Sequence, residues 1–369
     1  MRTAHRPADA RVPIVSAENY ILLAGDMHCH VSPPDHPSHV HRGLDETYAL
    51  AKREGLDFVV LTPHVWARFQ QERELRAFQI ESQRYLHAAI AAQPRDVMFI
   101  AGFEYTDGRY GHVGMAFADV EEALRASPVE DAQDHPEHFI EEWVRRGGLL
   151  TINHPFMTPV VSVFPAAREN MSWRPFTEPA LAVPEDIAVV QRLAHGYEIY
   201  NMMVSQLRDG WVLSDRTASI WKTVRYLDDE VARQRRRLTP VGGSDSHDSF
   251  LRPTTFVLAK DRSEKGIADA IRSGRTCVRD PHACTLRVRA GAREVGVGGT
   301  LEGVLTIEVT AGGRENFVFA NGELIGQPRA GEFVTHDVPN ICSVVRAYTD
   351  RGFSAPVYVN CGIEDGQQR

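Results

Sequence analysis

The chain lacks any uncharged run long enough to span a bilayer, and residues 1–20 contain charges and proline but no continuous apolar signal segment. Cysteine is scarce, and none of its pairs has CxxC spacing. The five positions are Cys29, Cys277, Cys284, Cys342 and Cys361. An odd number without close pairs argues against a disulfide framework and against a zinc finger. We therefore expect a cytoplasmic protein in a reducing compartment, with no membrane partner.

Basic surface is also scarce, because the net charge of the 369 residues is -8. The one basic cluster, Arg233 to Arg237 within VARQRRRL, is typical of the solvated end of a helix. Without a basic stripe that would displace counterions from a polyanion, we expect no nucleic-acid partner. The chain also contains no GxSxG elbow, Walker loop or dinucleotide fingerprint at a predicted strand end, which removes serine hydrolase and nucleotide-cofactor functions.

Short apolar runs alternate with amphipathic segments over the first three quarters of the chain. The predicted strands are 57–62, 97–104, 112–117, 148–153, 196–201, 238–245 and 254–260. The predicted helices between them include 44–55, 72–93 and 136–148. Repeated strand and helix units indicate an α/β fold, either a barrel or a doubly wound sheet.

Two regions depart from this alternation. Residues 155–195 are rich in proline and contain Trp173 and Phe176, which indicates a long insertion over one face, near the mouth of a barrel. From Ala283 onward, short alternating runs are broken by Gly and Asn-Gly, as in a small all-β sandwich. We expect a leader at 1–19, an α/β domain at 20–282 and a β-sandwich accessory domain at 283–369.

Histidines and carboxylates follow the predicted strands. In GDMHCHVS, His28 and His30 point to the same face of an extended segment, while Cys29 points to the other. Similar residues follow later strands, namely His64, Glu104, His154, Asp245 and His247. Each one alone is more typical of a structural residue. Because strand ends meet at one mouth of an α/β barrel, the set together predicts a metal centre.

Taken in order, GDMHCHVS, LTPH, GFEY, GHVGMAF, INHPF and GGSDSH resemble the motifs of the polymerase and histidinol phosphatase (PHP) superfamily of metallohydrolases. AIRSGRTCV and the ending SAPVYV look most like the branch that includes the carbaryl hydrolases. The resemblance extends over roughly residues 20–360. It implies a distorted (β/α)7 barrel followed by a small C-terminal β sandwich.

The resemblance also implies a set of ligands for two or three divalent ions (Zn, Mn or Fe). They are His28, His30, Asp35, His64, Glu104, His112, His154, Asp245 and His247. His36 competes with Asp35 for its place. Glu104 would bridge two ions, and His247 or His154 is a candidate proton donor, although a metal-bound imidazole is a poor acid. The second motif has Thr62-Pro63-His64 where the family commonly has Thr-Asp-His, so a contact of the missing carboxylate is in doubt.

The implied function is a hydrolase in which a metal-bridging hydroxide attacks a small-molecule phosphoester. A carboxylic or carbamate ester or amide substrate is the alternative, and a metal-binding module without activity is a remote one. Arg109 in EYTDGRYGH is a candidate contact for an anionic oxygen, or else a solvent-facing turn residue. The β sandwich is expected to pack on the barrel or to mediate a homo-oligomer.

Overall fold

The computed structural model describes residues 19–94, 96–156, 171–178, 180–205 and 216–363. The expected leader lies outside the described residues except for Asn19, as does the 157–170 part of the expected insertion. Trp173, within the described remainder of that insertion, is buried in the core, and its indole nitrogen donates to the Tyr226 hydroxyl at 3.3 Å.

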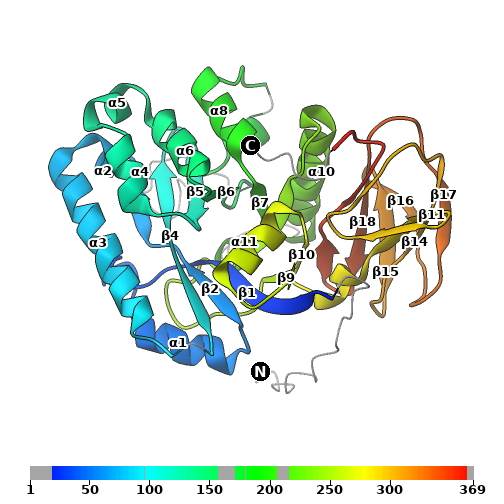
Figure 1. The fold of residues 1–369 in the computed structure, drawn as a ribbon, viewed down its shortest axis with the longest axis horizontal. Helices are drawn as coiled ribbons and strands as arrows, with labels where there is room; N and C mark the ends of the chain where they lie inside the picture. Colours follow the sequence, from blue (N-terminus) through cyan, green and yellow to red (C-terminus); the bar gives the residue numbers. More distant parts are fainter. Residues whose placement is uncertain (1–18, 95, 157–170, 179, 206–215, 364–369) are drawn as a thin grey trace.

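A mixed sheet curves through the first part of the chain (Figure 1). Its strands are β1 (Ile21–Cys29), β2 (Phe58–Leu61), β3 (His64–Trp66), β4 (Met98–Asp107), β5 (Gly111–Ala116), β6 (Leu149–Ile152), β7 (Gly196–Asn201) and β8 (Thr239–Gly243). Neighbours follow the order β1-β2-β4-β5-β6-β7-β8, and β3 pairs beside β4. The mixed α/β architecture that the alternation predicts is confirmed.

The two ends of this strand order meet. Asp245, just after β8, donates its backbone N–H to the His28 carbonyl at 2.8 Å, and His30 donates to the Ser246 carbonyl at 3.1 Å. Cys29 and Ser246 also form a parallel bridge. These bonds close the strands into a barrel-like ring at the carboxyl end of β1, which is where the first pair of histidines lies.

One strand runs against the others. β5 pairs antiparallel with both β4 and β6, whereas β1, β2 and β4 are parallel, as are β6, β7 and β8. The reversal brings the start of β5 to the mouth of the barrel, where His112 pairs with Thr106. β4 continues beyond Glu104 because β3 and β5 supply partners on both sides.

Helices cover the outside of the barrel (Figure 1). They are α1 (Leu44–Arg53), α2 (Arg68–Gln71), α3 (Arg73–Ala91), α4 (Val120–Ala126), α5 (Val129–Asp134), α6 (Pro136–Arg145), α7 (Arg174–Thr177), α8 (Glu185–Leu193), α10 (Arg216–Gln234) and α11 (Glu264–Arg272). Side-chain caps fix some of the helix starts, as where Asp119 accepts from the N–H of Glu122 before α4. None of the helices in the described part of the chain is long and apolar enough to cross a bilayer.

The barrel sheet continues without interruption into the C-terminal strands. β9 (Thr255–Ala259) pairs with β1, β10 (Thr276–Val278) with β9, β19 (Gly352–Ser354) with β10, and β18 (Ser343–Thr349) with β19. The remaining strands of this sheet are β20 (Val357–Val359), β13 (Thr300–Leu301), β15 (Asn316–Ala320) and β16 (Glu323–Gly326).

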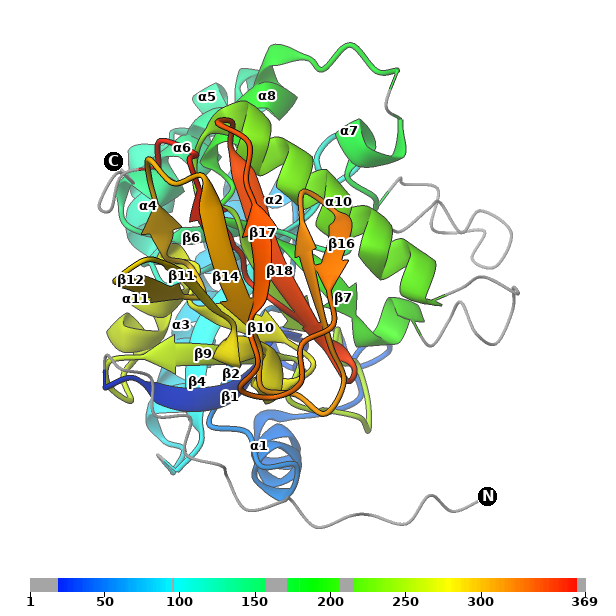
Figure 2. The ribbon, with the colours of Figure 1, turned by 90° about the vertical axis from the view of Figure 1, so that its right-hand side faces the viewer.

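A second, four-stranded sheet lies beside these strands (Figure 2). It contains β12 (Arg293–Gly296), β11 (Arg287–Ala290), β14 (Thr306–Thr310) and β17 (Val334–Asp337), and the short helix η1 (Pro281–Thr285) precedes it. Val288 and Val309 from this sheet share one hydrophobic core with Val345 and Val357 of the larger sheet and with Phe256 of β9. The C-terminal strands are therefore fused to the barrel through β9.

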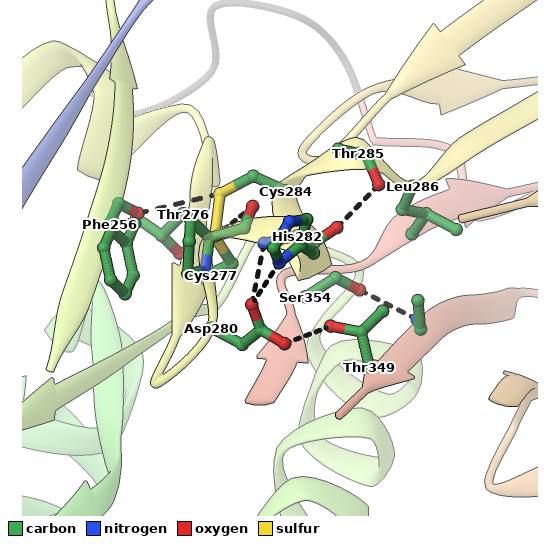
Figure 3. Close-up of a disulfide and its surroundings, with 12 residues drawn as sticks. Phe256, Thr276, Cys277, Asp280, His282, Cys284, Thr285, Leu286, Thr349 and Ser354 are labelled. Atoms are coloured by element: carbon green, nitrogen blue, oxygen red, sulfur yellow. Dashed lines mark hydrogen bonds and ion pairs between the residues drawn. A yellow bond between two sulfur atoms is a disulfide. The ribbon is translucent and has the colours of Figure 1, made fainter. Parts of the chain in front are cut away.

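The expectation of unpaired cysteines is wrong. Cys277 pairs with Cys284 (Figure 3), and Cys342 with Cys361, which leaves Cys29 as a buried thiol in the barrel. The number of cysteines is odd because four of them form two disulfides and Cys29 belongs to neither. Since disulfides persist mainly in oxidising compartments, the cysteines give no support to the expected reducing, cytoplasmic location.

Candidate metal centre

Glu104 occupies the middle of a cluster of imidazole rings at the barrel mouth. Its side chain is 1% exposed. Oε1 lies 3.1 Å from His28 Nε2 and 3.4 Å from His154 Nε2. Oε2 lies 3.1 Å from His112 Nδ1, 3.5 Å from His64 Nε2 and 3.7 Å from His30 Nε2. The two oxygens of one carboxylate therefore face two different groups of rings.

The strand order explains this convergence. His28 and His30 come from the end of β1, His64 begins β3, His112 lies at the start of the reversed β5, and His154 follows β6. Asn153, next to His154, donates from Nδ2 to Glu104 Oε1 at 2.9 Å and so fixes the central carboxylate. A Cβ on Gly114 would come 2.8 Å from the Asn153 side chain, so this approach needs a glycine.

Asp35 contacts the Nδ1 atoms of two rings, on the side that faces away from Glu104. Its Oδ2 is 3.0 Å from His30 Nδ1, and its Oδ1 is 3.1 Å from His64 Nδ1 and accepts the His64 backbone N–H at 2.9 Å. Both rings thereby direct Nε2 toward Glu104. His36, the competitor, is exposed, and its Nδ1 bonds to the Ser38 hydroxyl at 2.7 Å.

The segment after β8 completes the cluster. Asp245 Oδ1 lies 3.2 Å from His30 Nε2 and 3.5 Å from His28 Nε2. His247 donates from Nδ1 to the Asp245 carbonyl at 2.9 Å, and its ring stacks on His30 with centroids 4.2 Å apart. The structure thus brings together all nine residues that the sequence proposes as ligands.

Burial and neighbouring charges shift the pKa values of the cluster residues in opposite directions. Burial lowers the pKa of His28, but Glu104, Asp245 and Glu198 outweigh it and hold that pKa well above its usual value. For Glu104 burial raises the pKa, yet the neighbouring His112 and His28 hold it well below its usual range. Burial lowers the pKa of His247 to about 3. Bound cations would replace the positive charge that protonated rings otherwise supply to these carboxylates.

The residues fit divalent ions. The Nε2 atom of the buried His112 ring has no hydrogen-bond partner among the described residues, its Nδ1 faces Glu104 Oε2 at 3.1 Å, and His28 Nε2 faces His30 Nε2 at 3.1 Å. Because His28 and His30 each donate from Nδ1 to a carboxylate, the Nε2 atoms of the neutral rings present lone pairs, which are ready ligands. Groups of residues whose ligand atoms lie within 4.8 Å of one another include His28-His30-Glu104, Glu104-His112-His154, His28-His154-Asp245 and His30-His64-His247. Nitrogen and oxygen donors without thiolate suit Zn, Mn or Fe(II).

Sequence reasoning missed the contribution of β7. Glu198 is buried beside His28, and Asn201 lies between Glu198 and Asp245. A carboxylate in the middle of the apolar strand GYEIYN is the one signal that pointed to it, because a buried acid needs partners.

Arg109 pairs with a residue outside the cluster. Its side chain is 57% exposed in the turn between β4 and β5, and it forms an ion pair with Asp186 of α8. Pro63, which replaces the usual acidic residue, uses its carbonyl to accept the Glu104 N–H at 3.0 Å. A surface group, His135, Glu137 and His138, also has ligand spacing, but His138 already pairs with Asp131.

No protein-family model and no curated protein matches this chain. Among solved structures, a two-domain protein from Bacteroides vulgatus containing a predicted PHP-like metal-dependent phosphoesterase is 18% identical, with a TM-score of 0.44. That match covers 96% of this chain and 100% of the other. Endonuclease Q in complex with a 27-mer DNA duplex carrying an abasic lesion is 14% identical, with a TM-score of 0.40, over 68% of this chain and 57% of that one.

The lesion-specific endonuclease from Pyrococcus furiosus is 15% identical, with a TM-score of 0.41, over 75% of this chain and 64% of that one. This chain therefore spans only about six tenths of the matched endonucleases. At these identities and TM-scores no family or substrate is assigned to it. None of these three structures is a carbaryl hydrolase, so the resemblance to that branch gains no support.

The expected exclusion of nucleic acid is wrong. Two of the matched structures are endonucleases, and one of them holds a DNA duplex. The exclusion relied on the net charge of -8. A net charge averages over the whole chain and does not describe the local field at a site that binds cations.

Proposed function

We propose that this protein is a metal-dependent hydrolase of the PHP type that acts on phosphoesters. The observation that supports it is Glu104, a buried carboxylate with five imidazole rings around its two oxygens. The residues that would hold two or three ions are His28, His30, His64, Glu104, His112, His154, Asp245 and His247, with Asp35 orienting two of the rings. Bound ions would supply Lewis acidity, which activates water and stabilises charge on phosphoryl oxygens.

The chain itself provides orientation and access. Asp35 fixes two rings through Nδ1, and Asn153 holds the central carboxylate. His28, His30 and His154 are closed off from solvent, whereas His64 and His247 are each 12% exposed and mark the open side of the site. Substrate would enter on that side, where the ring of the exposed residue His39 lies 4.6 Å from that of His247.

The substrate class follows from the charge of the site. A cation cluster suits the oxygens of a phosphomonoester or phosphodiester, whether the phosphate belongs to a small molecule or to DNA. Arg109 is paired with Asp186 outside the cluster. In this proposal the phosphate therefore binds to the ions rather than to Arg109. Hydrolysis of a carboxylic or carbamate ester is the competing activity.

The experiment compares metal-stripped protein reloaded with Mn, Fe(II) or Zn. Each form is offered p-nitrophenyl phosphate, bis-p-nitrophenyl phosphate, a DNA duplex with an abasic site and naphthyl methylcarbamate. Turnover of a phosphate substrate only after reloading supports the proposal. Turnover of the carbamate alone, or of no substrate with any metal, contradicts it.

Replacing the central carboxylate tests the site directly. Glu104→Gln removes one negative charge that faces both groups of rings, and we expect kcat/KM on the active phosphoester to fall by at least about 100-fold. Glu130→Gln, at an exposed carboxylate paired with Arg73 on the surface, is the matched control and should stay within about twofold of the wild type. Equal activity of the two variants would remove Glu104 from the mechanism.

A further inference from the structure

Glu198 projects from the middle of β7 into the space behind the candidate metal centre. His28 donates from Nδ1 to Glu198 Oε1 at 3.2 Å. Glu198 Oε2 accepts the backbone N–H of His154 at 2.7 Å and the side-chain amide of Asn201 at 3.0 Å. One buried carboxylate therefore contacts two candidate ligands that come from other strands.

Asn201 extends this contact to a third ligand. Its Nδ2 also donates to Asp245 Oδ2 at 3.1 Å, while its Oδ1 accepts the N–H of Val204 at 2.9 Å. Because the backbone N–H of Val204 can only donate, this bond identifies the oxygen of the Asn201 amide. The NH2 group is therefore directed toward Glu198 and Asp245.

The three ligands reached by this pair form a group of their own. His28, His154 and Asp245 offer ligand atoms within 4.8 Å of one another. His154 has a φ of +25°, which is unusual for a residue with a side chain, and its N–H is the one that Glu198 holds. The backbone of β8 is also shaped around the contact, since a Cβ on Gly243 would lie 2.2 Å from Glu198 Oε1 and 2.3 Å from the His28 Cβ.

We propose that Glu198 and Asn201 are positioning residues for the ion that His28, His154 and Asp245 share, an inference that rests on the proposed metal centre. By accepting the Nδ1 proton, Glu198 keeps the lone pair of His28 on Nε2, which faces Glu104 at 3.1 Å. Carboxylates in this outer position orient an imidazole and increase its basicity as a ligand. Asn201 orients Asp245 by donating to Oδ2, which leaves Oδ1 facing His28 and His30.

The test measures binding of Mn²⁺ to metal-stripped protein by electron paramagnetic resonance, which counts free Mn²⁺ at each addition. Glu198→Gln removes the negative charge but keeps the size of the side chain. We expect the affinity for one ion to fall by about 10- to 100-fold, with the other ions bound as in the wild type.

Glu230→Gln is the matched control, because Glu230 is also buried but bonds to Gln191 and Arg233 on the helical layer. It should bind Mn²⁺ like the wild type. A folded Glu198→Gln variant with wild-type affinity overturns the inference, as does an equal loss in Glu230→Gln. If Glu198→Gln does not fold, Asn201→Ala decides, with the same loss expected. A wild type that binds no Mn²⁺, Zn²⁺ or Fe²⁺ refutes the proposed function itself.

Discussion

At the residue scale, burial and neighbouring charges shift the pKa values of the imidazole rings around Glu104 in opposite directions. Burial lowers the pKa of His30, but hydrogen bonds to Asp245 and Asp35 raise it to about 9. The same opposition holds the pKa of His28 well above its usual value. In metal-free protein the His30 ring therefore carries a positive charge at neutral pH.

Metal binding should consequently release protons, because an imidazole must be neutral to bind an ion. With a pKa of about 9 for His30, the apparent affinity for Zn²⁺ rises with pH up to about pH 9 and levels off above it. Each released proton contributes roughly a tenfold gain in affinity for each unit of pH. Calorimetry in two buffers with different ionisation enthalpies measures the release, and an affinity independent of pH from 7 to 9 would contradict it.

The convergence of the candidate ligands could be predicted because their order and spacing along the chain are distinctive, as in the HxH of β1 and the DxH after β8. The residues that support them could not. Glu198 and His28 are 170 positions apart, and no local pattern links a single acid on an apolar strand to a ring that distant. The same holds for Asn201, whose role depends on where β7 meets β8.

At the element scale, most strands begin and end near the predicted positions. Buried runs such as FVVL of β2 combine β-branched residues with complete burial, which specifies a strand within a few residues. The reversal of β5 was not predictable, because nothing in GHVGMAF specifies whether this strand runs parallel or antiparallel to its neighbours. That direction decides whether His112 lies at the mouth or at the bottom of the barrel.

A buried ion pair joins the helical layer to the C-terminal strands. Arg346 of β18 is 2% exposed and pairs with Asp228 of α10 at 2.5 Å, and it also donates to the Ser354 carbonyl. Arg346→Met leaves Asp228 buried without its cation, and we expect a loss of about 3 to 5 kcal/mol in the free energy of unfolding.

Urea unfolding measures this loss. Arg289→Met serves as the control, because its pair with Glu308 lies on the surface of the four-stranded sheet and is worth at most about 1 kcal/mol. Similar unfolding midpoints for the two variants would show that the pair between α10 and β18 does not hold the elements together.

At the scale of the whole molecule, the composition predicted an α/β region followed by an all-β region but not how they join. The turn-rich runs after Ala283 mark the β strands. The pairing of β9 with β1 and of β10 with β19 connects segments far apart in sequence, and no local pattern encodes it. The cysteine pairs were missed for the same reason.

The two disulfides should add to stability by restricting the unfolded chain. They close segments separated by 7 and 19 residues, and loop-closure entropy gives about 2 and about 3 kcal/mol. Cys342→Ser together with Cys361→Ser should therefore lower the free energy of unfolding by about 3 kcal/mol. Adding a reductant to this variant should cost less than adding it to the wild type, and equal costs in both would contradict the second pairing.

The shared strand β1 has a mechanical consequence. One edge of β1 pairs with β2 of the barrel, and the other pairs with β9, which leads through β10 to the C-terminal strands. The two parts therefore cannot rotate as separate bodies without breaking hydrogen bonds of the very strand that ends in His28 and His30. A pull on the C-terminal strands would be transmitted along the sheet to these two candidate metal ligands, so the molecule resists hinge motion and transmits force through its candidate active site.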